Sequence, residues 1–461
     1  MSDGYEENNS ELLKENLKQN IGVLIERGLF QEASSIITAY EKLIKEDSDI
    51  VSMKADIALK QNDLDNAARY LQECLSLDSS NHDMLYKLGK VYEAKNKSKL
   101  AEDFFKRAFK MRGNMESELT EESEAPYENK RLLKNVNIYI RCPAMIVTGG
   151  PELLHQLCYK LNVFGYNAWM FYRNCKENHS PTPDRYKKYN TSYVTELCDD
   201  KNQIVIVPET AIEDFFKFPE SRKIIWWLSV DHFLLSCQRR GYDESKVFDK
   251  IRKQAGDNRT IHFAQSQYAM DYLKSKGIDS NEIYYLSDYL NDEFMKQASA
   301  LQTEEHRLPN ILFNPKKGYE FTSKLMELSP ELNWIPLTGY TPEEMRMLMN
   351  RSMVYVDFGN HPGKDRIPRE AAICGCCIVV GKCGAARNPV DIPIPEEFKI
   401  ERKEENIELV VNKIRHLLNH YHEETDKFSE YRNMILNEEG RFEDDLYNCL
   451  ERLDKYYPFL Q

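Results

Sequence analysis

The chain has 461 residues, 41% of them hydrophobic, and a formal net charge of −13, a composition typical of a globular protein with room for about three domains. It contains no apolar run of about 18 residues, which excludes a membrane-spanning helix, and its acidic balance argues against nucleic-acid binding, which needs a basic face. The polar, acidic first residues do not resemble a secretory signal, and eleven scattered cysteines suit free thiols in a reducing cytoplasm better than a disulfide framework.

The first 115 residues repeat with an interval of 34 (67 − 33 and 101 − 67), marked by Ala33, Ala67 and Ala101. Each unit has the pattern helix, polar turn, helix, and a small residue at the repeated position lets paired helices approach closely. Two further series keep the interval: Gly28, Asn62 and Asn96, and Ile37, Leu71 and Phe105. The third unit resembles a tetratricopeptide repeat at its main positions, Leu85, Leu88, Gly89, Tyr92, Ala101, Phe105 and Ala108. We therefore expect an all-α repeat domain over residues 1–115, which serves either a protein partner or self-association.

Residues 116–133 are polar and acidic and are typical of a linker. From residue 134 short apolar strands alternate with helices, a pattern that predicts a parallel, doubly wound sheet. The sequence predicts a first Rossmann-like domain over residues 134–301, with strands at 135–140, 168–172, 203–207, 223–228, 260–264 and 282–286, a Gly149-Gly150 turn, and helices at 151–164 and 266–276.

A second Rossmann-like series follows a polar break at 302–307 and spans residues 308–424. Thr341, Pro342 and Glu344 give one of its helices a capping box and a proline in the first turn. The predicted strands lie at 310–313, 333–336, 353–358 and 376–380, and further helices at 319–328, from about Pro368, and at 406–420. Helices at 425–436 and 442–456 close the chain, and we expect residues 425–461 to pack back on the body.

A basic, glycine-containing loop joins the strand at 353–358 to the helix near Pro368. Gly359 and Gly363 make it flexible, and Lys364 and Arg366 make it cationic. A loop of this kind before a helix N-terminus holds a phosphate group well, because backbone N–H groups and the helix dipole favour anions. The alternative is a solvated ion-pair loop, since Lys364 and Arg366 flank Asp365.

Several motifs resemble glycosyltransferases of the GT-B type. These are Asn-Pro-Lys-Lys-Gly at 314–318, Leu-Thr-Gly-Tyr at 337–340, and Glu-Ala-Ala-Ile-Cys-Gly at 370–375, which is similar to the Glu-Ala-x-x-x-Gly element of retaining enzymes. More closely, residues 134–400 resemble glycosyltransferases of bacterial surface-polysaccharide loci, on Thr-Gly-Gly-Pro-Glu at 148–152 and Trp-Trp-Leu-Ser-Val-Asp at 226–231. The resemblance implies an α/β fold with a GT-B-like pair of facing Rossmann-type domains behind the TPR-like arm, the first on the acceptor side and the second on the nucleotide-sugar side.

The resemblance also implies roles for individual residues. Glu370 would hydrogen-bond the donor ribose, Lys317 the donor phosphates, and Gly339 and Tyr340 would hold the nucleotide base. Gly149 and Gly150 would approach donor and acceptor, and Lys364 and Arg366 would bind the diphosphate. Retaining members usually carry a second Glu eight positions before the ribose Glu, but that position is Pro362 (370 − 8), so a retaining or an inverting outcome stays open.

Asp231 and His232 follow an apolar strand, and such a pair can act as acid and base on an acceptor hydroxyl. His232 could equally offer its backbone carbonyl to the donor sugar or be structural. His361 lies in the basic loop, where it could join a phosphate cradle, and Glu209 follows a strand and could cap a helix.

Four cysteines, Cys374, Cys376, Cys377 and Cys383, lie close together. Their spacing matches neither a zinc nor an iron–sulfur site, so we interpret them as core packing. No Asp-x-Asp ends a strand in this region and no GxGxxG motif is present, which predicts no metal and no cofactor other than the donor, with Lys and Arg neutralising the diphosphate.

The leading hypothesis is a cytoplasmic, metal-independent glycosyltransferase of the hexosyltransferase class. It would move a sugar from a nucleotide-diphosphate sugar to a glycan or protein acceptor, and the repeat arm would recruit a protein partner. The alternatives are a non-catalytic scaffold with a degenerate transferase body, or another nucleotide-sugar enzyme such as an epimerase. The sequence specifies neither the sugar, the nucleotide, the acceptor nor the oligomeric state.

Overall fold

The computed structural model describes residues 3–43, 47–79, 81–116, 133, 136–173, 175, 180–255, 260–291, 294–295 and 307–456. The chain forms two compact units. The helical unit consists of Met1–Lys134, Leu157–Ala168 and Tyr186–Thr191, and the α/β unit of Asn135–Gln156, Trp169–Arg185 and Ser192–Gln461. Apart from its two end residues, the predicted linker at 116–133 lies outside the described residues, and the predicted domain boundaries stay predictions.

Three helix pairs build the helical unit: α1 (Asp3–Glu26) and α2 (Phe30–Leu43), α3 (Ser48–Lys60) and α4 (Leu64–Leu77), and α5 (His82–Ala94) and α6 (Ser98–Glu116). The repeated Ala33, Ala67 and Ala101 are buried between paired helices. Backbone conformation explains why Gly28, Asn62 and Asn96 recur at the turns, because all three have positive φ angles (75°, 56° and 58°). Only Gly, and to a lesser degree Asn, adopts this left-handed conformation at low cost.

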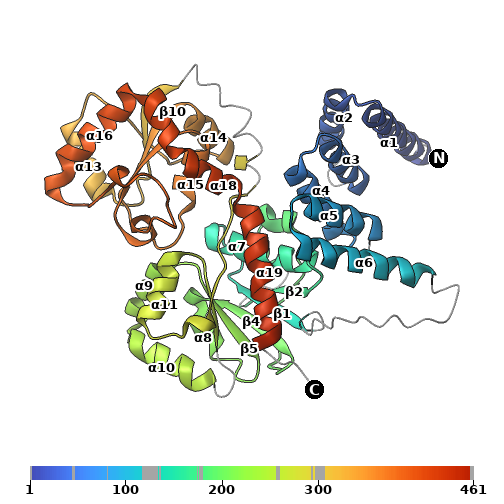
Figure 1. The fold of residues 1–461 in the computed structure, drawn as a ribbon, viewed down its shortest axis with the longest axis horizontal. Helices are drawn as coiled ribbons and strands as arrows, with labels where there is room; N and C mark the ends of the chain where they lie inside the picture. The colour runs from blue at the N-terminus through green and yellow to red at the C-terminus, as the bar shows by residue number, and fades with distance from the viewer. Residues whose placement is uncertain are drawn as a thin grey trace. The chain divides into compact units, whose positions relative to one another are not determined.

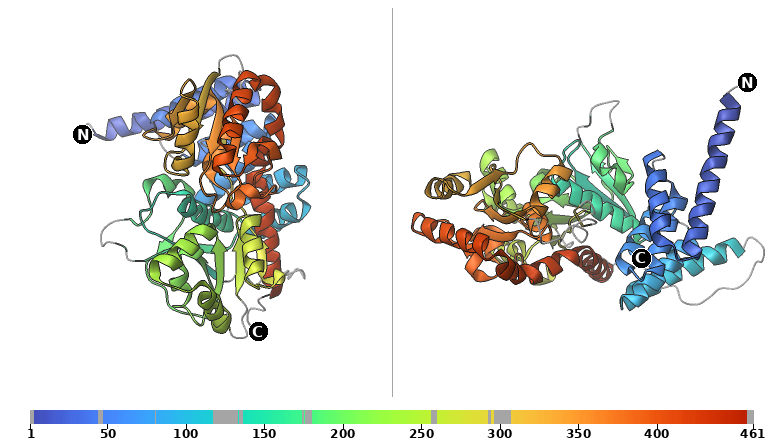
Figure 2. Two further views of the ribbon diagram at one scale, coloured as in Figure 1. Left: turned by 90° about the vertical axis from the view of Figure 1, so that its left-hand side faces the viewer. Right: turned by 90° about the horizontal axis from the view of Figure 1, so that it is seen from above.

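The α/β unit contains two sheets (Figures 1 and 2). The first has seven strands in the order β3-β2-β1-β4-β5-β6-β7, and β1–β4, β4–β5, β5–β6 and β6–β7 are parallel pairs. The order reverses between β1 and β4, where open α/β sheets form a crevice at the strands' carboxyl ends. The strands are β1 (Asn137–Cys142), β2 (Asn167–Tyr172), β3 (Tyr193–Val194), β4 (Gln203–Pro208), β5 (Arg222–Trp227), β6 (Ile261–Ala264) and β7 (Ile283–Tyr285).

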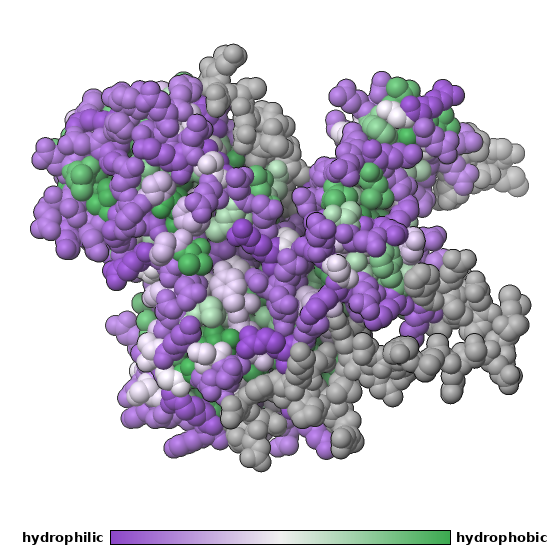
Figure 3. Space-filling model, in the orientation of Figure 1, coloured by the Kyte–Doolittle hydropathy of each residue, from purple (hydrophilic) through white to green (hydrophobic). Residues whose placement is uncertain are grey.

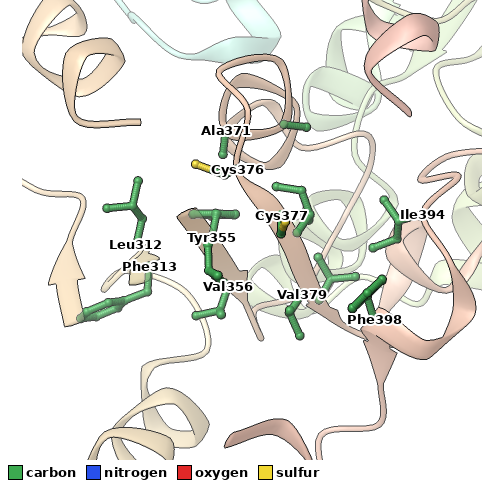
Figure 4. Packing of buried hydrophobic residues seen from close by; sticks show 14 of the residues in the cluster. Leu312, Phe313, Tyr355, Val356, Ala371, Cys376, Cys377, Val379, Ile394 and Phe398 are labelled. Atoms are coloured by element: carbon green, nitrogen blue, oxygen red, sulfur yellow. The ribbon is translucent and has the colours of Figure 1, made fainter. Parts of the chain in front are cut away.

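The second sheet has five strands in the order β12-β11-β10-β8-β9, all parallel. They are β8 (Leu308–Phe313), β9 (Asn333–Pro336), β10 (Ser352–Asp357), β11 (Cys377–Gly381) and β12 (Lys399–Ile400). Figure 4 shows how Tyr355 and Val356 of β10 and Cys377 and Val379 of β11 pack with side chains of neighbouring elements in one buried cluster. Helices cover both faces of such a sheet, so its central strands are apolar throughout. The predicted α/β class with a helical repeat arm is confirmed.

The helices of the second sheet are α13 (Tyr319–Leu328), α14 (Pro342–Asn350), α15 (Arg366–Ile373), α16 (Ile407–Asn419), α17 (Tyr421–Glu424) and α18 (Ser429–Leu436). The predicted capping box is confirmed, since Thr341 and Glu344 exchange both of its bonds. The predicted helix near Pro368 is confirmed as α15, which begins two residues earlier, at Arg366. A proline is tolerated in a first turn, where the N–H that it lacks would have no partner within the helix.

The helices of the first sheet are α7 (Gly149–Val163), α8 (Ile212–Phe215), α9 (Val230–Arg240), α10 (Glu244–Ala255) and α11 (Gln267–Ser275). The sequence predicted strands on either side of α9 and α10 but not these two helices. The predicted turn at Gly149 and Gly150 is wrong, since both residues are the first of α7. Ser229 caps α9, and Gly241 ends it with a φ of 66°. On the face drawn in Figure 3, hydrophobic residues gather in small, separate groups.

The last helix, α19 (Glu438–Tyr456), returns to the first sheet. Its Cys449 Sγ lies 3.5 Å from the carbonyl oxygen of Tyr285 in β7, and the rings of Phe442 and Tyr289 are 5.2 Å apart. Figure 1 shows α19 in red running from α18 along the first sheet. None of the helices in the described ranges has the length and apolar content needed to span a bilayer.

Candidate functional site

A cavity of about 650 Å³ in the α/β unit is lined by segments that follow strand ends in both sheets. Its volume suits a small-molecule ligand. The first sheet contributes α9, and the second contributes the turn after β8, the loop after β10 and the segment after β12. The lining residues are Asp231, His232, Leu235, Lys316, Lys317, Gly318, Tyr319, Glu320, Phe321, Lys324, Asn360, Pro362, Arg402 and Glu404.

The turn after β8 places cations at the start of α13. Gly318 has a φ of 62°, and a Cβ there would lie 2.2 Å from the carbonyl oxygen of Phe358, so only glycine fits. Lys317 Nζ lies 2.8 Å from Asp365 Oδ2. Lys316 and Arg402 also line the cavity, and together with the N-terminal N–H groups of α13 they make this wall attractive to anions, whereas Lys324 is paired there with Glu404.

Asp231 and His232 form the opposite wall. They lie in the first turn of α9, where Ser229 Oγ accepts the N–H of His232 at 3.3 Å. Asp231 Oδ1 accepts the phenolic O–H of Tyr268 at 2.9 Å, and burial together with this carboxylate raises the pKa of Tyr268. His232 is exposed and also lines a smaller cavity of about 460 Å³. The structure thus brings Lys317, Asp231 and His232 to one cavity.

A group of charges supports the loop after β10. The side chain of His361 is fully buried, with Nε2 3.8 Å from Asp357 Oδ1 and Nδ1 3.3 Å from Asp365 Oδ2. Burial opposes protonation of His361, but Asp365 and Asp357 outweigh it and raise its pKa. Burial likewise acts against ionisation of Asp365, but His361 and Lys317 lower its pKa.

This group also offers three metal-ligand atoms within 4.8 Å of one another, on Asp357, His361 and Asp365. The ammonium of Lys317 forms an ion pair with Asp365. Asp357 already accepts hydrogen bonds from the N–H of Gly359 and the O–H of Tyr355, both at 2.9 Å. Both carboxylates already have partners, Lys317 and His361 at Asp365 and two hydrogen-bond donors at Asp357, so these residues do not fit a divalent cation.

Lys364 and Arg366 are not among the described residues that line the cavity. Lys364 is buried, and its Nζ donates to Ser287 Oγ at 2.8 Å and lies 3.3 Å from Glu438 Oε1. Arg366 forms an ion pair with Glu152 of α7, and its Nε lies 3.7 Å from Glu370 Oε1. Both side chains are therefore held in buried ion pairs, not in the solvated loop around Asp365 that the alternative described, since Asp365 pairs with Lys317 and His361.

Arg366 also lies against the first turn of α7. A Cβ on Gly149 would be 3.1 Å from Arg366 Cδ, and one on Gly150 would be 3.7 Å from Leu228 Cδ1. Glu370 is buried, and burial raises its pKa against the opposing charge of Arg366. Gly149, Gly150, Arg366 and Glu370 thus form a second group beside the cavity.

Gly339 and Tyr340 lie apart from both groups in the contacts described. Gly339 has a φ of 80° with open space around it, and Tyr340 is 39% exposed. The structure brings neither of them to the cavity lining.

Sequence reasoning missed the structural role of Glu209. Its carboxylate does not cap the turn that it begins but accepts the N–H of Leu228 at 2.9 Å, at the start of α9. Burial raises the pKa of this carboxyl to about 8. Sequence reasoning also missed Glu152, Arg402 and Lys324, because their partners are distant in sequence and no local pattern marks them.

All eleven cysteines are free thiols, as predicted. Cys374, Cys376 and Cys377 are buried in the core of the second sheet. Burial raises the pKa of Cys376 to about 11 and of Cys377 to about 12, which keeps these thiols protonated and inert. The interpretation as core residues is confirmed for these three, but Cys383 is only half-buried and lies outside the core cluster.

Residues 48–81 and 82–115 match the family model of the tetratricopeptide repeat, which confirms the repeat arm. No curated protein matches the chain by sequence.

Solved structures similar to the chain include HepE from Anabaena in complex with UDP and glucose, at 11% identity and a TM-score of 0.48, over 68% of this chain and 99% of that one. A glycosyltransferase from Rickettsia africae shares 13% identity over 71% of this chain and 100% of that one, with a TM-score of 0.48. TarM from S. aureus, in complex with UDP, shares 15% identity over 56% of each chain, with a TM-score of 0.40. At these values we draw nothing from them about substrate or reaction.

Proposed function

We propose that the chain is a glycosyltransferase that uses a nucleoside-diphosphate sugar as donor and a glycan or protein as acceptor. One observation carries the proposal. A single cavity has a cationic wall, with Lys316, Lys317 and the start of α13, facing a wall with Asp231 and His232.

The cationic wall suits the donor diphosphate. Breaking the anomeric bond leaves negative charge on the diphosphate, and fixed cations and helix N–H groups that face it stabilise that charge. Lys317, whose ammonium is paired with Asp365 in the free chain, would supply such a charge, and we expect no metal ion to be needed. Arg402 adds charge to the same wall, while the charge of Lys324 is balanced by Glu404.

The opposite wall suits the acceptor. His232 is exposed in the cavity and can take the proton of an acceptor hydroxyl as a general base. Asp231, the preceding residue, is held by Tyr268 and lines the same cavity. The smaller cavity shares His232 and Leu235 with the larger one, and we assign it to the acceptor.

The second group completes the proposed donor site. Glu370 would take the ribose, and the backbone of Gly149 and Gly150 would approach the diphosphate if Arg366 turned to bind it. Glu152 forms an ion pair with the Arg366 guanidinium in the free chain, so a bound diphosphate would compete with this carboxylate for Arg366. Gly339 and Tyr340 are proposed for the base, and His361 and Lys364 act through the loop that they anchor.

Calorimetric titration with UDP, GDP, ADP and CMP sugars tests the proposal. One nucleotide class should bind, and Lys317→Met should weaken it on the order of tenfold to a hundredfold, the value of a charge-assisted hydrogen bond. Lys413→Met is the matched control, because Lys413 pairs with Glu397 on the same sheet's periphery and should leave binding unchanged.

His232→Ala should lower the transfer rate by about 10²–10⁴ and leave donor binding intact. Binding of no nucleotide sugar, or equal binding by Lys317→Met and the wild type, would overturn the proposal. Product analysis separates transfer from an epimerase reaction.

A non-catalytic scaffold is the second candidate. It is favoured by the ion pairs that hold Lys364 and Arg366, the two cations expected at the diphosphate. A stable protein partner held by the repeat arm, with no nucleotide sugar bound or turned over, would support it. The free thiols favour the cytoplasm in either case.

A further inference from the structure

Four ionisable side chains are buried together where the chain crosses between the two sheets: Arg369, Asp288, Glu438 and Lys364. Asp288 follows β7, on the segment that leaves the first sheet. Glu438 is the first residue of α19, on the segment that returns to it. Arg369 and Lys364 belong to α15 and the loop before it, so one cluster joins the second sheet to both crossing segments.

Arg369 is the centre of this cluster, and its side chain is only 1% exposed. Its Nη2 lies 2.6 Å from Asp288 Oδ2, and its Nη1 lies 2.7 Å from Glu438 Oε2. The same guanidinium donates to the carbonyl oxygens of Lys364 at 3.0 Å and Asp365 at 3.3 Å. One planar group thus binds the outgoing crossing, the returning crossing and the basic loop.

Charges buried this deeply are unfavourable unless they are paired. A fold that needed only to fill this space could use apolar residues at lower cost. Lys364 reinforces the arrangement, because its Nζ contacts both Ser287 of the outgoing segment and Glu438 of the returning one. Two cations therefore bind the same two segments, which is the arrangement expected of a clamp at a hinge.

The basic loop depends on the same guanidinium. Pro362, in that loop, accepts the N–H of Val230 in α9 at 3.0 Å, and a Cβ on Gly363 would lie 2.5 Å from the carbonyl oxygen of Leu228. The loop thus contacts the start of the helix that carries Asp231 and His232. Any rotation of one sheet against the other would break these contacts as well as the clamp.

We propose that Arg369 is a positioning residue that fixes the angle between the two sheets, and with it the spacing between the Lys317 wall and the His232 wall of the cavity. Arg suits this position because a guanidinium can bind two carboxylates and two carbonyl groups in one plane, which a lysine cannot. Arg369 itself touches no substrate in this scheme.

The test uses the full chain with fluorophores at exposed Lys250 of α10 and Glu408 of α16, introduced as unnatural amino acids because the chain has its own thiols. Single-molecule energy transfer then reports the distance between the sheets. Wild type should give one narrow distribution. Arg369→Lys, Asp288→Asn and Glu438→Gln should each broaden it or add a second population.

Arg432→Lys is the matched control. Arg432 of α18 also binds backbone carbonyls at the end of α15, those of Ala372 and Gly375, but neither crossing segment. It should keep the narrow distribution. An unchanged distribution in the folded fraction of all three clamp variants would show that the cluster only stabilises the fold, and would overturn the proposal.

Transfer provides a second readout, which rests on the proposed function. Arg369→Lys should lower kcat by about tenfold or more with little change in donor KM, because each wall stays intact and only their spacing is lost. If wild type shows no transfer but the clamp variants broaden the distance distribution, the proposed function is refuted and the positioning role of Arg369 is supported.

Discussion

Replacing Gly318 by alanine tests the close approach that builds the cationic wall. Gly318 has a φ of 62°, and a new Cβ would lie 2.2 Å from the Phe358 carbonyl oxygen and 2.5 Å from the Gly359 nitrogen. These atoms belong to the backbone, so no side-chain rotation can relieve the clash. The turn after β8 and the loop after β10 must therefore move apart.

The cost has two parts. An alanine in the left-handed conformation costs roughly 1–2 kcal/mol, and displacing packed backbone costs about 1–3 kcal/mol more. Gly241→Ala isolates the first part, because Gly241 has a φ of 66° and a Cβ there would meet nothing within 4 Å. We expect the two variants to differ by about 1–3 kcal/mol.

Hydrogen exchange measures this difference locally, which matters because a chain of two units need not unfold in one step. Gly318→Ala should speed exchange in α13 and in residues 359–365, and should weaken nucleotide binding. Gly241→Ala should affect only the end of α9. Equal destabilisation by the two substitutions would refute the close approach.

Three further predictions concern buried side chains. The pKa of His361 is raised in the folded chain, so protonated His361 contributes fully to stability below about pH 6.5, the pKa of an unfolded histidine. This contribution is lost as the pH rises through the folded pKa. Thermal melts against pH should show the loss in wild type and not in His361→Gln. The pKa of Glu209, raised to about 8, means that the folded chain binds the extra proton, so stability should fall between about pH 4.5 and pH 8. Glu209→Gln should remove that fall, on the order of 5 kcal/mol, and a variant as pH-dependent as wild type would contradict the assignment. An aromatic disulfide reagent should modify Cys198, which is exposed, and more slowly Cys175 and Cys383, while the eight buried thiols should react only after denaturation; fast modification of Cys376 in the native chain would contradict its burial.

The sequence predicted most of the strands, since central parallel strands are apolar runs bounded by turns. It also predicted the Gly28, Asn62 and Asn96 series, because a fixed interval and a backbone requirement coincide there. The helices α9 and α10 were missed because they are rich in polar and charged residues. The caps of α9, Ser229 and Gly241, were the local signal that could have found that helix.

The site was predicted only in part. Lys317, Asp231 and His232 meet at one cavity because each follows a strand end, and strand ends can be predicted from local pattern. The partners of Lys364, Arg366 and Arg369 could not be predicted. Arg366 pairs with a residue 214 positions away, and Arg369 with residues 69 and 81 positions away. Only the topology of the two sheets brings these charges together.

The return of α19 to the first sheet has a consequence for biosynthesis. A ribosome makes β7 early but must complete the whole second sheet before the helix that packs on that strand emerges. Until then the edge of the first sheet exposes Tyr289 and the backbone of β7, without Phe442 and Cys449 against them. Nascent chains expose such surfaces to aggregation and chaperones. Release of a chain that stops before Glu438 should therefore yield a first sheet with one bare flank, although every one of its strands is present.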